Sequence, residues 1–163
     1  MKKLALTIVT FLLINIVSAQ LKATPVCPAF VVDILEGTIS SKVDCTSTAG
    51  EVKKFFPCFT EAKEDSTNSG CGGVFFKDKD ISFFTSRGYI EIGENFKGKL
   101  EPALIGVSRS NLFSLLGNPV IKDPTWDAFK TSYGLLVLYY NSTGKINKLQ
   151  FTNKSAETLK LCE

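Results

Sequence analysis

The sequence predicts an α+β fold made of two helix-plus-β-hairpin repeats, with the helices packed on an antiparallel sheet. A pattern of capping and apolar residues recurs after 60 residues, and a pair of apolar, aromatic-rich segments follows each copy. The first repeat spans about residues 46–93 and the second about residues 104–152. These two observations carry the prediction.

Both repeats begin with a predicted helix. Thr48 and Glu51 have the spacing of a capping box, Pro57 ends the first helix, and Gly117 ends the second. Four positions have a counterpart 60 residues later: Thr48 and Ser108, Val52 and Leu112, Phe55 and Leu115, Phe56 and Leu116. Because the cap and the apolar face recur together, the offset indicates a repeated unit.

Each predicted helix is followed by a predicted β-hairpin. The strands span residues 73–76 and 81–85 in the first repeat, and residues 134–140 and 145–152 in the second. Polar residues with turn chemistry separate the strands of each pair. In the last strand Ile146 and Leu149 do not alternate strictly, which predicts a β-bulge near Lys148. Residues 88–93 indicate one further strand.

Residues 1–19 have the pattern of a cleavable signal peptide. Two lysines precede an apolar run over residues 4–17, and we expect cleavage after Ala19. About 14 apolar residues are fewer than the roughly 20 that a membrane-spanning helix needs. We therefore expect residues 20–163 to form a single secreted or periplasmic domain with no membrane span.

Charge and the lack of histidine exclude several functions. Without residues 1–19 the chain has 17 basic and 16 acidic residues, so a nucleic-acid partner is not expected. The chain contains no histidine, which removes the usual general base near neutral pH and the Ser-His-Asp triad. We expect no enzyme, no metal ion and no cofactor.

Carboxylate pairs are the remaining alternative for catalysis. Glu61, Glu64 and Asp65 form one acidic group, and Asp123 and Asp127 form another. A pair of carboxyl groups is what a glycoside hydrolase uses as acid and base. Both groups lie in polar, turn-like sequence, where solvated charge is the usual case, so we assign no catalytic residue.

Five cysteines follow the predicted signal peptide and predict two disulfides and one free thiol. No CxxC spacing is present, which disfavours a metal site. The preferred bond joins Cys58 to Cys71, closing a loop of about 14 residues worth on the order of 3 kcal/mol. Cys27, Cys45 and Cys162 compete for the second bond. Cys27 with Cys45 is slightly favoured because it is local, while Cys162 is the alternative that would hold the C-terminal tail.

Aromatic residues suggest an interface. Phe75 with Phe76, and Phe83 with Phe84, are adjacent on predicted strands, so one of each pair points away from the core. Such side chains are covered by other elements of the chain or by a partner. Trp126 lies in a predicted loop, as a lid over the core or as a binding anchor. The candidate interface residues are Trp126, Phe75, Phe83 and Tyr139.

The second repeat resembles the superfamily that includes the β-lactamase inhibitor proteins (BLIP-like) and the SmpA/OmlA outer-membrane assembly lipoproteins. The resemblance rests on Ile105-Gly106-Val107-Ser108, Leu112, Leu115-Leu116-Gly117-Asn118-Pro119, Tyr133-Gly134-Leu135 and the turn over residues 141–145. It covers residues 105–152 clearly and residues 48–85 faintly, where Phe55-Phe56-Pro57 departs from the pattern. The resemblance implies tandem α+β units and a protein-binding sheet surface, with no named partner.

The expected function is a secreted or periplasmic, non-enzymatic protein-binding module, such as an inhibitor or immunity protein. The first alternative is an envelope-associated structural or assembly accessory protein. The second and weaker alternative is a carboxylate-dependent hydrolase. In the favoured case the partner is a protein whose identity the sequence does not reveal.

Overall fold

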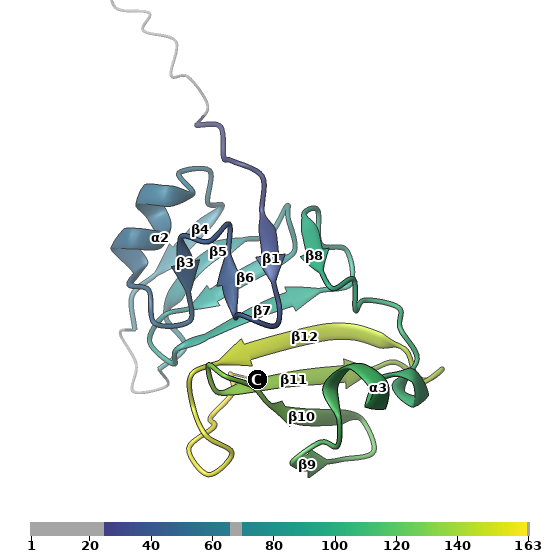
Figure 1. The fold of residues 1–163 in the computed structure, drawn as a ribbon. Helices are drawn as coiled ribbons and strands as arrows, with labels where there is room; N and C mark the ends of the chain where they lie inside the picture. The colour runs from purple at the N-terminus through teal and green to yellow at the C-terminus, as the bar shows by residue number, and fades with distance from the viewer. Residues whose placement is uncertain (1–24, 66–69, 163) are drawn as a thin grey trace, which may run out of the picture.

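The computed structural model describes residues 25–65 and 70–162 and shows a fold dominated by β-structure. In these ranges twelve strands form a four-stranded sheet, sheet A, and an eight-stranded sheet, sheet B (Figure 1). The helical segments are short: α2 (Ala49–Phe55), the 3-10 helix η1 (Arg109–Asn111) and α3 (Phe113–Leu116). No helix of the described ranges has the length and apolar character needed to cross a membrane.

Sheet B is antiparallel throughout and consists of two consecutive four-stranded meanders. Its order is β4 (Glu61–Lys63), β5 (Gly73–Phe76), β6 (Ile81–Phe84), β7 (Tyr89–Gly93), β12 (Ile146–Thr152), β11 (Leu135–Tyr140), β10 (Trp126–Lys130) and β9 (Ile121–Lys122). The meanders meet where β7 pairs with β12, with Ile92 opposite Leu149 and Ile90 opposite Phe151. These four apolar residues form the middle of one continuous sheet face.

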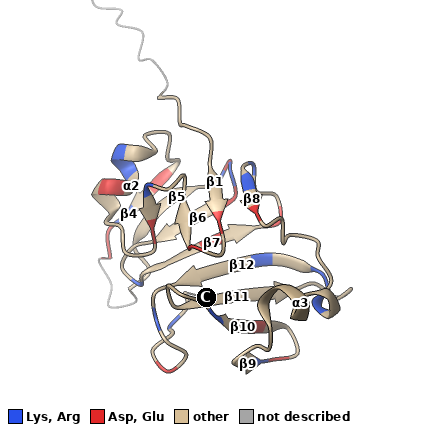
Figure 2. Ribbon diagram, in the orientation of Figure 1, with Lys and Arg blue, Asp and Glu red and all other residues tan. Residues whose placement is uncertain are grey.

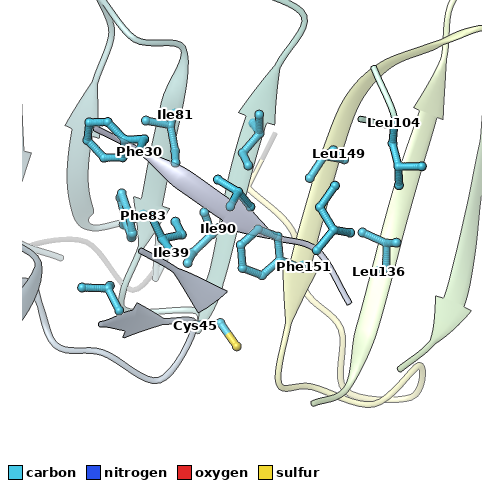
Figure 3. Packing of buried hydrophobic residues seen from close by; sticks show 14 of the residues in the cluster. Phe30, Ile39, Cys45, Ile81, Phe83, Ile90, Leu104, Leu136, Leu149 and Phe151 are labelled. Atoms are coloured by element: carbon cyan, nitrogen blue, oxygen red, sulfur yellow. The ribbon is translucent and has the colours of Figure 1, made fainter. Parts of the chain in front are cut away.

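Sheet A covers part of that face. Its order is β3 (Val43–Asp44), β2 (Thr38–Ile39), β1 (Val31–Asp33) and β8 (Lys99–Glu101), with β1 and β8 parallel. Phe30, next to β1, stacks on Phe56 with ring centroids 4.2 Å apart and contacts Phe76 edge-on at 5.1 Å. Figure 3 shows Phe30 and Ile39 packed against the side chains of sheet B.

The segment between the meanders extends the same core over the second meander. Leu104 and Leu112 are each 2% exposed and belong to the cluster that contains Phe129, Leu136 and Leu149. In Figure 1, α3 lies beside the end of β10. The two sheets and this segment therefore share one hydrophobic core.

The predicted fold of two helix-plus-hairpin repeats is wrong. Each expected hairpin is part of a four-stranded meander, and sheet A was not predicted at all. The strands β4 and β9 have three and two residues, too few to show a periodic pattern. Residues 126–130, expected as a loop, form β10. The prediction gave residues 73–76 and 134–140, now β5 and β11, the same place in the two repeats. In the structure β5 is the second strand of its meander and β11 the third, so the counterpart of β5 is β10.

Several local predictions are confirmed. Thr48 and Glu51 form a reciprocal capping box at the start of α2. The register between β11 and β12 shifts so that Tyr139 pairs with Lys148 and Tyr140 with Ile146, which is the expected bulge. Ser108 precedes η1 without a side-chain cap, so the two helix starts are not equivalent in their hydrogen bonds.

The chain has two disulfides, as predicted, but neither predicted pairing is correct. Cys27 is bonded to Cys58 and Cys71 to Cys162, while Cys45 is a buried free thiol. Cys58 precedes β4 and Cys71 precedes β5, and these strands are antiparallel, so the two cysteines lie at opposite ends of the hairpin. Their Cα atoms are therefore farther apart than the separation that a disulfide can span.

The two disulfides fit an extracellular or periplasmic protein. The predicted signal peptide and its cleavage site after Ala19 lie outside the described residues.

The disulfides differ in the length of chain that they enclose, with sequence separations of 31 and 91 residues. We expect the C71A/C162A variant to lose roughly 1 kcal/mol more free energy of unfolding than the C27A/C58A variant, because the longer closed loop constrains the unfolded chain more. Urea denaturation of the two oxidised variants measures this difference. A larger loss for C27A/C58A would contradict the expectation.

Burial raises the pKa of the Cys45 thiol from about 9 to about 11, and nearby Asp44 adds to the effect. Below pH 9 the thiol is protonated in both the folded and the unfolded chain, so it does not alter stability. Between pH 9 and 11 only the unfolded chain ionises, and the free energy of unfolding falls. We expect this fall to be smaller in the C45A variant. Equal pH dependence of the two proteins in urea denaturation would contradict the assignment.

Candidate functional site

Sheet B has a face that points away from sheet A, which we call the outer face. Ile90 and Leu149 belong to the core, and successive strand residues point to opposite sides, so Glu91 and Gln150 lie on the outer face. Part of this face is covered by the C-terminal tail, because Cys162 is bonded to Cys71 and its N–H donates to the Tyr89 hydroxyl at 3.0 Å. The remaining part carries two predicted interface residues.

Trp126, Tyr139 and Lys148 are aligned across β10, β11 and β12 on the outer face. The two ring centroids are 6.5 Å apart, and Lys148 Nζ lies 4.2 Å from the Tyr139 ring centroid. The Tyr139 hydroxyl donates to Gln150 Oε1 at 2.9 Å, and Gln150 Nε2 donates to Glu91 Oε2 at 2.6 Å. We call these five residues the outer-face cluster. The hydrogen bonds and the cation–π contact within the cluster hold the Tyr139 ring in place beside Trp126 on a half-buried surface.

The other two predicted interface residues are not part of this cluster. Phe83 is 1% exposed in the core and has no surface to offer a partner. Phe75 lies on the outer face, but it is 9% exposed and packs edge-on against Phe84 at 5.4 Å. The surplus phenylalanines of the first meander are thus largely covered by the chain itself.

A groove lies on the opposite side of the second meander, between η1, α3 and strands β9 and β10. Its volume is about 530 Å³. We call it the Arg109 groove. Arg109, Leu112, Phe113, Pro119, Lys122 and Phe129 are among the residues that line it.

Arg109 and Asp127 form an ion pair at the inner wall of this groove. Arg109 Nε donates to Asp127 Oδ2 at 2.9 Å and Nη2 donates to Oδ1 at 2.5 Å. The Tyr140 hydroxyl donates to Asp127 Oδ2 at 2.8 Å, and its ring centroid lies 4.7 Å from Arg109 Cζ. Asp127 is only 3% exposed, so this buried carboxylate has its charge and both oxygens matched. Figure 2 shows an acidic position, in red, on β10 and a basic position, in blue, beside α3.

The ion pair also fixes a loop. Arg109 Nη2 donates to the Asp123 carbonyl at 2.7 Å and Nη1 to the Pro124 carbonyl at 3.2 Å. The hydrogen bonds that Arg109 donates to Asp127 raise the pKa of Arg109, and burial raises the pKa of Tyr140, so both side chains keep their protons. Arg109 was missed at the sequence level. One feature of the sequence could have singled it out: the chain has only two arginines, and its other basic residues are lysines.

Exposed apolar side chains gather next to the groove. Seven large apolar residues of the described ranges are exposed, and three of them fall within residues 113–120: Phe113 at 67%, Leu115 at 46% and Val120 at 52%. We call these three residues the apolar ridge. Phe113 also lines the Arg109 groove, whereas Val120 lines a neighbouring groove that includes Tyr133.

No protein-family model, curated protein or solved structure matches this chain.

Three of the acidic side chains considered for catalysis, Glu61, Asp123 and Asp127, are held in structural contacts. Glu61 forms ion pairs with Lys63 and Lys77, which lower its pKa. The Thr125 N–H and hydroxyl donate to Asp123 and lower the pKa of that carboxyl. Wherever the described chain shows a shifted carboxyl pKa, the shift is downward, whereas a general acid needs a raised one. Within the described ranges no group of three or more Cys, Asp or Glu is arranged to hold a metal ion.

We expect D127A to lower the free energy of unfolding by about 2–3 kcal/mol, because it leaves the Arg109 charge without a partner. This loss is smaller than that expected on breaking a fully buried ion pair, because the Arg109 side chain is 28% exposed. Urea denaturation measures it. The matched control is D78A, which removes an exposed pair with Lys79 and should change stability by less than about 0.5 kcal/mol. Equal losses for the two variants would contradict the role of the pair.

Proposed function

We propose that this chain is a secreted or periplasmic, non-enzymatic protein-binding module that contacts its partner through the apolar ridge and the Arg109 groove. The single observation that carries this proposal is the concentration of exposed apolar surface in residues 113–120 beside a groove of about 530 Å³. Exposed apolar patches next to a concave surface are typical of protein interfaces.

The geometry favours binding over catalysis. The ridge lies directly after a segment that Arg109 ties to β10 and to the loop over residues 123–125. A backbone held in this way loses little conformational freedom when a partner docks, so more of the contact energy appears as affinity. Phe113, as an aromatic side chain at the edge of a pocket, has the position of a binding anchor.

Inhibition of a secreted enzyme, or immunity to one, is a concrete form of this proposal. The resemblance of residues 105–152 to the BLIP-like superfamily supports it, since ridge and groove are formed largely by this part of the chain. Trp126 and Tyr139 stay predicted interface residues of a second surface, on the outer face. An envelope assembly role is the alternative outcome of the test below.

We expect the F113S/V120S variant to lose at least about tenfold in affinity for the partner, because it removes two exposed apolar contacts of the ridge. Wild-type and variant chains are used to capture partners from the envelope and secreted fractions of the cells that produce the protein, with mass spectrometry and titration of the captured protein. The control V26S/L35S changes two residues that are 86% and 44% exposed outside the ridge.

Capture of one stoichiometric partner by the wild type and the control, with loss in F113S/V120S, supports the proposal. Capture of assembly machinery alone favours the envelope accessory role instead. A partner that binds F113S/V120S as tightly as the wild type overturns the assignment of the ridge.

A further inference from the structure

We propose that the partner segment in the Arg109 groove is acidic and carries a large apolar side chain. This inference rests on the proposed function, since it names the chemistry of the partner at the same site. It follows from two properties of the groove. Its walls are apolar, and the lysines around it form no ion pair within the described residues.

The apolar property comes from three side chains that differ in burial. Leu112 and Phe129 are each 2% exposed and form part of the groove lining, while Phe113 is 67% exposed. An inserted apolar side chain would contact the two buried residues and cover the Phe113 ring. Removing that ring from water is favourable at about 25 cal/mol per Å² of apolar surface. The groove therefore suits an aliphatic or aromatic side chain.

The charge property comes from two lysines. Lys122 lines the groove, and Lys145 follows Gly144, which also lines it. A β-bridge between Ser108 and Lys145 places Lys145 at the end of the groove where η1 begins. Both lysines are exposed, and neither forms an ion pair within residues 25–65 and 70–162.

The negative charges nearby compensate the positive charges only in part. Asp127 is matched by Arg109 and Tyr140. The Asp123 carboxylate accepts hydrogen bonds from Thr125. Arg109, Lys122 and Lys145 carry three positive charges against the two negative charges of Asp123 and Asp127, which leaves the surroundings of the groove with a net positive charge.

An acidic partner segment satisfies both properties. A neutral apolar segment would cover the groove but would bring Lys122 out of water without a counter-charge, which is unfavourable. A basic segment would be repelled. Carboxylates placed beside an apolar side chain would pair with the lysines while the groove buries that side chain. Association should then weaken as salt concentration rises.

The test uses a peptide probe and the full mature chain. The probe is acetyl-Asp-Phe-Asp-Leu-amide, and its neutral counterpart is acetyl-Asn-Phe-Asn-Leu-amide. Titration is followed by the amide NMR signals of Phe113, Lys122 and neighbouring residues. We expect the acidic peptide to shift these signals and to bind about tenfold more tightly than the neutral one, because only the acidic peptide pairs with the lysines.

Charge-reversal variants complete the test. We expect K122E/K145E to weaken binding of the acidic peptide by about tenfold or more, and the matched control K42E/K54E, at exposed lysines outside the groove, to leave it unchanged. All four positions are exposed, so the variants should fold, which the amide spectrum shows directly. Equal binding of both peptides, or unchanged binding by K122E/K145E, overturns the inference.

The outcome is separable from that of the proposed function. If a captured partner depends on Phe113 and Val120 but not on Lys122 and Lys145, the ridge is an interface and the acidic character of the partner is wrong. If the partner does not depend on Phe113 and Val120, the proposed function itself fails at this site.

Discussion

The antiparallel pairing of β7 with β12 is the constraint on which the rest of the structure depends. It joins two meanders that are distant in the sequence and places Ile92 beside Leu149 and Ile90 beside Phe151. Sheet A then packs on the first meander, and the segment with Leu104 and Leu112 packs on the second. Each layer has only a short run of apolar residues, so each depends on the shared face to bury them.

The Arg109 and Asp127 pair plays a comparable role for the candidate site. Asp127 occupies a core-facing position of β10, where a carboxylate is tolerated only because Arg109 and Tyr140 match it. In return, the pair positions η1 and the loop over residues 123–125. The ridge and groove are therefore built on short helical turns and loops that this side-chain network holds in place.

The same pair explains why part of the fold could not be predicted. In residues 126–130 the core-facing positions are Asp127 and Phe129, and the aspartate breaks the apolar alternation by which a strand is recognised. Its partner Arg109 lies 18 residues away, beyond any local pattern. Strands with clear alternation, such as β6 and β7, were predicted close to their observed bounds. For the site, Trp126 and Tyr139 were both named as candidate interface residues, but not as neighbours. Of the ridge, Leu115 was placed on the apolar face of the predicted helix, and Phe113 and Val120 were not singled out.

The amino-acid sequence by itself determined the features that depend on nearby residues: the Thr48 capping box, the bulge at Lys148 and the number of disulfides. Only the tertiary structure decided that Cys27 pairs with Cys58 and Cys71 with Cys162, that Phe83 is buried, and that Phe113 is exposed. The physical reason is the range of the interactions. A cap or a turn is stabilised by hydrogen bonds across a few residues, whereas disulfide partners and buried faces are set by strand pairings between residues that the chain brings together only when both sheets form.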